Sequence, residues 1–234
     1  MMKAILTSLS ALLLLIAFGS CRKYGTDNGT AESGLTANTT YHCDTVNYIG
    51  SPRVFTSAGE LTDRSKVDQY LAAHSYLFGN PSPAGMHPSN IYSTSSRMVY
   101  FDVSAVYKAT LLQDSALTLE QQDTSKVTHT SDAAGTDIIY QNELRFQSVR
   151  NALLDMQNSY TAVTRLSPES YRTAEALMLK AKYTAGSITL PYNFLAMGAV
   201  MKSYPLPLRS VPAPNVQPGD TLVLQQGSIT FRQP

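Results

Sequence analysis

The sequence contains no tryptophan and only two cysteines, Cys21 and Cys43. Two cysteines exclude a framework of several disulfides as the source of stability, so the chain has to bury a hydrophobic core. The 14 tyrosines and 7 phenylalanines supply aromatic side chains for that core. The length of 234 residues suits one domain, or at most two small ones.

The chain also lacks an excess of charge of either sign. It carries 18 lysines and arginines against 17 aspartates and glutamates, and its longest basic run is the pair Arg22-Lys23. A nucleic-acid-binding protein needs clustered cations to follow the phosphates. We therefore expect no nucleic-acid partner.

Familiar catalytic motifs are missing as well. We find no nucleophile elbow, no glycine-rich phosphate loop, no His-Glu-x-x-His motif and no EF-hand loop. The histidines are scattered at positions 42, 74, 87 and 129, and the adjacent residues His42-Cys43-Asp44 cannot easily face one metal ion. The sequence predicts no catalytic residue, no metal ligand and no cofactor, although two distant carboxylates brought together by the fold would escape such a search.

One long apolar run is present, at the start of the chain. Lys3 precedes 15 residues, Ala4 to Phe18, that are apolar except for Thr7, Ser8 and Ser10. A basic start, an apolar run of this length and small residues after it are the layout of a secretory signal. The run is shorter than the roughly 20 apolar residues that span a membrane.

The end of this run, Phe18-Gly19-Ser20-Cys21, resembles the lipobox of bacterial lipoproteins. Gly19, Ser20 and Cys21 match that pattern, and Phe18 stands where the family usually has Leu, Val or Ile. The resemblance implies that residues 1–20 are removed and that Cys21 carries three acyl chains, where two already suffice for stable anchoring. It implies a cell-envelope location at the outer membrane, on either its surface or its periplasmic face. The alternative is an ordinary thiol in a secreted protein without a lipid.

Residues 21–45 have the composition of a flexible tether. Arg22 to Thr40 contains three glycines and a single large aliphatic residue, Leu35. Such a segment buries too little apolar surface to offset the entropy of ordering it. Cys43 is then either a small buried hydrophobe or a stray thiol in the tether, and we favour the second. A single β-rich domain is expected over 46–234.

One helix is predicted near the start of this domain, with Thr62 as its cap and Gly79 as its end. Val67, Tyr70, Leu71, His74 and Leu77 form its apolar stripe, on which His74 is expected to be a half-buried core residue. A long loop, Gly79 to Ser96, follows it. Long loops in compact domains often bind ligands, and His87 and Tyr92 are the candidate ligand-binding residues.

The rest of the chain favours strands. The pattern predicts strands at 53–56, 97–103, 138–146, 222–224 and 229–231, and a hairpin of 105–112 with 115–121. Residues 123–130 are expected to be a further short strand or its loop, and 187–192 and 195–204 to be strands or extended chain. Residues 131–135 are expected to turn, and 151–160 to form a helical turn. Residues 167–183 fit a helix or a strand, and we favour a strand from about Thr173. Five prolines between 205 and 218 predict a surface crossing.

These patterns together predict a mainly β fold, either an antiparallel β-sandwich or a lipocalin-like barrel, with one flanking α-helix. For function we expect a lipid-anchored envelope protein that binds a ligand or partner, such as a glycan or an envelope protein. The alternatives are an envelope hydrolase whose site is assembled from scattered residues, and a purely structural component.

Overall fold

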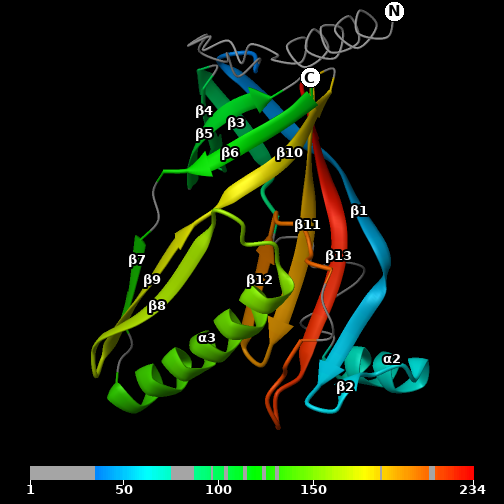
Figure 1. Ribbon diagram of the computed structural model, residues 1–234, viewed down its shortest axis with the longest axis vertical. Helices are drawn as coiled ribbons and strands as arrows, with labels where there is room; N and C mark the ends of the chain where they lie inside the picture. The colour runs from blue at the N-terminus through cyan, green and yellow to red at the C-terminus, as the bar shows by residue number, and fades with distance from the viewer. Residues whose placement is uncertain are drawn as a thin grey trace, which may run out of the picture. The chain divides into compact units, whose positions relative to one another are not determined.

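The computed structural model describes residues 35–74, 87–95, 97–102, 105–112, 115–122, 125–129, 132–184, 186–210 and 214–234. Within these ranges the fold is mainly β (Figure 1). The strands are β1 (Thr39–Thr56), β2 (Gly59–Glu60), β3 (Asn90–Ser95), β4 (Met98–Phe101), β5 (Ala105–Leu112), β6 (Ala116–Gln121), β7 (Ser125–His129), β8 (Tyr160–Ser167), β9 (Ser170–Ala176), β10 (Met178–Thr184), β11 (Ser187–Met197), β12 (Val200–Tyr204) and β13 (Leu222–Arg232). The helices are α2 (Arg64–Ala73) and α3 (Ala133–Leu153).

Eight antiparallel strands close into a barrel. Around the ring they run β1-β3-β4-β5-β6-β10-β11-β13, and the ring closes because β13 pairs with β1 while β10 pairs with both β6 and β11. This spatial order is also the order along the chain, which is the arrangement of an up-and-down barrel. Of the two predicted architectures, the lipocalin-like barrel is therefore confirmed.

The barrel interior is filled by side chains. Phe101 of β4 and Phe231 of β13, which are not neighbours in the ring, meet inside it with ring centroids 6.4 Å apart. Seven inward-pointing residues have no surface that a water molecule could contact: Tyr41, Ile91, Val99, Leu119, Leu179, Ile188 and Phe231. An eight-stranded barrel is just wide enough for its own side chains to fill.

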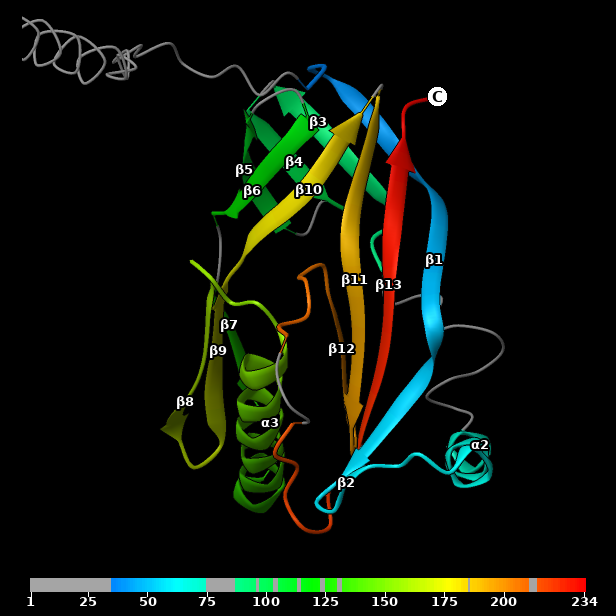
Figure 2. The ribbon, with the colours of Figure 1, turned by 45° about the vertical axis from the view of Figure 1, so that its right-hand side comes forward.

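Three barrel strands continue beyond the ring and form an open sheet. β1 pairs with β3 only through Thr39–His42 but with β13 as far as Phe55. β11 likewise pairs with β10 through 187–189 and with β12 through 193–197. Figure 2 shows the long strands β1, β13 and β11 running from the barrel into this sheet, with β12 beside β11. β12 is the last strand of the sheet.

The chain between β6 and β10 forms a separate layer. It contains β7, β8 and β9, which make a three-stranded antiparallel sheet in the order β7-β9-β8, and it contains α3. α3 packs against β8 and β9 on one side and against β12 on the other (Figure 2). The packing of this layer on β12 brings charged side chains of α3, β9 and β12 next to one another.

Helix α3 corrects the predicted turn at 131–135 and the predicted strand at 138–146. Asp132 caps the helix by accepting a hydrogen bond from the amide of Gly135. The buried side chains, Thr136, Phe146, Val149, Arg150 and Leu153, follow helical spacing over the last turns. The misleading signal came from Ile138, which has the same two-residue parity as Tyr140, Leu144 and Phe146 in the sequence but is exposed to solvent.

The other predicted elements agree more closely. α2 is present, capped by Asp63 instead of Thr62, and the His74 ring stacks on Tyr70 with its Nδ1 2.8 Å from the Tyr70 carbonyl. The predicted hairpin is β5–β6, and the ambiguous stretch 167–183 is β9 and β10, as favoured. The predicted strands at 222–224 and 229–231 are one continuous strand, β13.

The start of the ordered domain lies earlier than expected. β1 begins at Thr39, so the last part of the predicted tether is a barrel strand. Residues 90–95, predicted as part of a long loop, are β3. Both errors have one cause, since pairing with a neighbouring strand ties down threonine-rich and serine-rich segments that could not form a core alone.

Candidate functional site

The side chains of Cys43 on β1 and His87 lie next to each other. The Cys43 Sγ lies 3.9 Å from the His87 Nδ1, and the His87 ring packs edge-on against Tyr192 with centroids 6.3 Å apart. Burial, followed by the Asp44 and Asp102 carboxylates, raises the pKa of the Cys43 thiol. A thiol of this kind is not an activated nucleophile. Cys43 is therefore a half-buried core residue of β1, not a thiol in a tether.

Tyr92 lies elsewhere. Its neighbours Ile91 and Ser93 are buried inside the barrel, so Tyr92 points outward from β3, opposite Thr40 and Tyr100 on the adjacent strands. His87 instead packs against inward residues. The two candidate ligand-binding residues are thus not brought into one site, and Cys21 lies outside the described residues.

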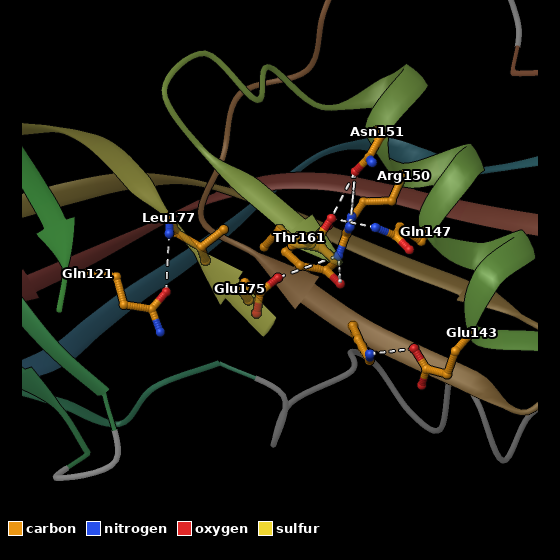
Figure 3. A network of polar contacts seen from close by, with 10 residues as sticks. Gln121, Glu143, Gln147, Arg150, Asn151, Thr161, Glu175 and Leu177 are labelled. Carbon is orange, nitrogen blue, oxygen red and sulfur yellow. Dashed lines mark hydrogen bonds and ion pairs between the residues drawn. The ribbon is translucent and has the colours of Figure 1, made fainter. Parts of the chain in front are cut away.

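The charged cluster of the structure is centred on Arg150, near the end of α3 (Figure 3). Its side chain is only 5% exposed and reaches from α3 toward β9 and β12. Its Nη1 donates to the Tyr204 hydroxyl at 3.1 Å and lies 3.4 Å from the Glu175 Oε1. Its Nε and Nη2 donate to the Asn151 Oδ1 at 3.2 and 2.9 Å. A buried guanidinium with this many partners holds one fixed position.

A second ion pair lies beside the first. Lys202 of β12 donates to the Glu143 Oε2 at 2.8 Å, and its ammonium is 5.8 Å from the centre of the Phe146 ring. Glu143, Phe146 and Arg150 share one face of α3 by their spacing, and Lys202 and Tyr204 share one face of β12. Two ion pairs therefore bridge α3 to the strands: α3 supplies the cation in Arg150–Glu175 and the anion in Glu143–Lys202.

Glu175 is the perturbed acid of this cluster. Burial raises the pKa of its carboxyl above the ordinary value, with Arg150 and Lys202 opposing that rise and Glu143 adding to it. Burial also raises the pKa of the Tyr204 hydroxyl. The Glu175 side chain nevertheless keeps 36% of its surface exposed, so a partner in solution can reach it.

An open depression lies at this point of the surface. It has a volume of about 260 Å³ and is lined by Glu175, Met201, Lys202, Ser203 and Tyr204. We call it the β9–β12 depression. A second depression, of about 310 Å³, is lined by five residues that all come from α3, including the exposed Ile138. Only the first of these two combines residues of two elements, β9 and β12, and its residues Glu175 and Tyr204 contact the buried Arg150, so it is the candidate site.

The described part of the chain contains neither a clustered set of metal ligands nor a membrane-spanning helix. Within it, no group of three or more His, Cys, Asp or Glu side chains is arranged to hold a metal ion. Neither helix there combines the length and the apolar character needed to cross a membrane.

The comparisons with known proteins add no identity. No family model matches this chain, and neither a curated protein nor a solved structure matches it.

Sequence reasoning missed the charged cluster altogether. Arg150 and Glu175 are 25 residues apart, and Glu143 and Lys202 are 59 apart. The one local signal was the spacing of Glu143, Phe146 and Arg150, which places them on one helical face. That signal was lost once the segment was assigned to a strand.

Proposed function

We propose that this chain is a lipid-anchored binding protein of the cell envelope, which holds a partner at the β9–β12 depression. The observation that carries the proposal is the buried Arg150, which donates to the Tyr204 hydroxyl at 3.1 Å and lies 3.4 Å from the Glu175 carboxylate before any partner arrives. Groups that are already ordered bind with a smaller loss of entropy.

The filled barrel supports a surface site over an interior one. A lipocalin-type ligand would need space among inward side chains such as Tyr41 and Phe231, which have no exposed surface. The open depression offers charged and hydroxyl groups that are already positioned. An envelope protein is the partner we favour, and a glycan is the other class.

The anchor is tested by the substitution Cys21→Ala. We expect this variant to lose labelling by a palmitate analogue and to leave the membrane fraction, whereas Cys43→Ala keeps both properties. Membrane retention of Cys21→Ala would contradict the lipid anchor. Protease shaving of intact cells then tells whether the domain faces outward or toward the periplasm.

The site is tested by photo-crosslinking in cells. A photoreactive phenylalanine analogue replaces Met201 in the depression or, as a control, Leu112, which is 49% exposed on β5. We expect a discrete adduct from position 201 and none from position 112. Mass spectrometry of the adduct distinguishes a protein from a glycan. The absence of any adduct at 201, or the same adduct at both positions, would contradict binding at this site.

A second candidate function, an envelope hydrolase, is favoured by one observation. A carboxyl whose pKa is raised by burial keeps its proton to higher pH and so suits the role of a general acid, and Glu175 is such a group in an open depression. This candidate predicts release of reducing ends from envelope glycans, with loss of the activity in Glu175→Gln. Turnover that is unchanged in Glu175→Gln would exclude Glu175 as the acid.

A further inference from the structure

The β9–β12 depression runs along the edge of a strand, not over one face of it. Successive side chains of a strand point to opposite faces of the sheet. Four consecutive residues of β12, from Met201 to Tyr204, line the depression together with Glu175. A depression beside the strand edge is within reach of side chains on both faces.

The turn before β12 fixes which backbone groups face that edge. Gly198 and the residue after it connect β11 to β12, and Gly198 has a φ of 59° at the first turn position, as a type II′ hairpin requires. The residues flanking such a turn, Met197 and Val200, bond to each other through their backbones. Since bonding alternates along an antiparallel pair, Lys202 also faces β11 and the amide of Met201 is directed away from it.

This edge has no strand beside it in the described part of the chain, where β12 pairs with β11 alone. An edge strand presents backbone donors and acceptors at the spacing of another extended chain. The depression, at about 260 Å³, is smaller than the roughly 300–1,000 Å³ of sites that enclose a small molecule. An extended segment that passes through needs no such enclosure.

The charges of the site indicate one side chain of the partner. Among the described residues, Lys202 is already bonded to Glu143 at 2.8 Å, whereas the one contact of the Glu175 carboxylate, with Arg150, is long at 3.4 Å. A carboxylate can accept several hydrogen bonds, and burial penalises Glu175 as long as too few are made. A further cation at the open side of Glu175 would offset that penalty.

We propose that the outer edge of β12 binds an extended polypeptide segment of the partner by β-strand addition, with a lysine or arginine side chain of that segment on Glu175. This inference rests on the proposed partner-binding function and gives its mode. Backbone hydrogen bonds to β12 supply the affinity, and the ion pair sets the register of the added strand.

The probe is a fluorescent seven-residue peptide of alternating Thr and Val with a central Lys, mixed with the full chain in detergent. Fluorescence anisotropy gives its Kd. One matched peptide carries N-methyl groups on alternate amides, and another has norleucine in place of lysine. We expect N-methylation to abolish binding and norleucine to weaken it at least fivefold.

The protein variants separate the backbone from the side chain. Met201→Pro removes the outward amide, which edge strands tolerate because no bond to β11 is lost, and should weaken binding at least tenfold. Met201→Ala keeps the amide and should bind within threefold of the unchanged chain. Glu175→Gln should weaken binding of the lysine peptide but not of the norleucine peptide. Circular dichroism checks that each variant is folded.

Equal binding of the N-methylated peptide, equal binding by Met201→Pro, or no binding of the lysine peptide overturns strand addition. If one of these peptide results occurs and position 201 still gives a discrete crosslink, the partner-binding function stands and only strand addition is rejected. If one of them occurs and position 201 gives no crosslink, strand addition and the partner-binding function are both rejected.

Discussion

At the residue scale, Gly227 shows how the long strands fit together. Its register partners are Tyr48 on β1 and Tyr192 on β11, whose rings lie edge to face with centroids 6.4 Å apart. A Cβ at Gly227 would overlap the backbone carbonyl of Asn47. The glycine therefore lets β1 approach β13, and the two tyrosines cover the gap left by the missing side chain.

We expect Gly227→Ala to lower the free energy of unfolding by about 2–3 kcal/mol, because overpacking forces the backbone to move. The control is Gly50→Ala on β1. Gly50 has a φ of 69° and no atom near its Cβ position, so that variant suffers strain alone, about 1 kcal/mol. Urea denaturation measures both losses. Equal losses would mean that contact with Asn47 is not the reason for the glycine.

The pH dependence of stability is a second residue-scale test. The pKa of Glu175 is raised above its ordinary value of 4.5, mainly by burial. The folded state therefore binds the proton more tightly, so this contribution is complete below about pH 4.5 and is lost as pH rises through the folded pKa. Glu60 is the opposite case, since its hydrogen bond from Arg53 lowers its pKa.

We expect Glu175→Gln to gain stability relative to the unchanged chain as pH rises above about 4.5. Glu60→Gln should instead lose stability relative to the unchanged chain as pH rises from the lowered folded-state pKa of Glu60 to about 4.5. Urea denaturation at a series of pH values gives both differences. Differences of the same sign would contradict the environment described for one of the two carboxyls.

At the element scale, α3 is the clearest test of the structure against the sequence pattern. Ile138 and Phe146 have the same parity, so a strand would place both on one face. In the helix, Phe146 is 1% exposed and Ile138 is 64% exposed. We expect Phe146→Ala to cost about 3–5 kcal/mol and Ile138→Ala less than about 0.5 kcal/mol. Urea denaturation gives both values, and similar costs would support the strand.

Helix α3 also shows which parts of the fold the sequence pattern could predict. Strands with strict alternation, such as those holding Val99 and Phe101 or Leu117 and Leu119, were predicted because each inward residue sits on a two-residue period. α3 was not, because its exposed side chains mimic that period. The charged cluster depends on α3, on the insertion of β7–β9 and on the hairpin of β12. Its ion pairs join residues distant in the chain, so the helical spacing of Glu143, Phe146 and Arg150 alone could not have predicted it.

At the scale of the whole molecule, the barrel is closed by its first and last strands. β1 begins at Thr39 and β13 ends at Arg232, and their pairing brings together almost the full length of the described chain. A closed ring has no edge from which a strand can separate without breaking two ladders. A destabilising substitution in β13 should therefore also lower the stability of strands that do not pair with β13.

Phe231 provides this test, since it is fully buried on β13 and meets Phe101 across the interior. We expect Phe231→Ala to lower the free energy of unfolding by about 3–5 kcal/mol. Hydrogen exchange should show the slowest amides of β5 and β6 losing protection by that same amount, although neither strand is hydrogen-bonded to β13. In contrast, Ile138→Ala on the exposed face of α3 should leave those amides unchanged. Loss of protection confined to β1, β11 and β13 would show that the ring opens locally, and that closure does not make the barrel one cooperative unit.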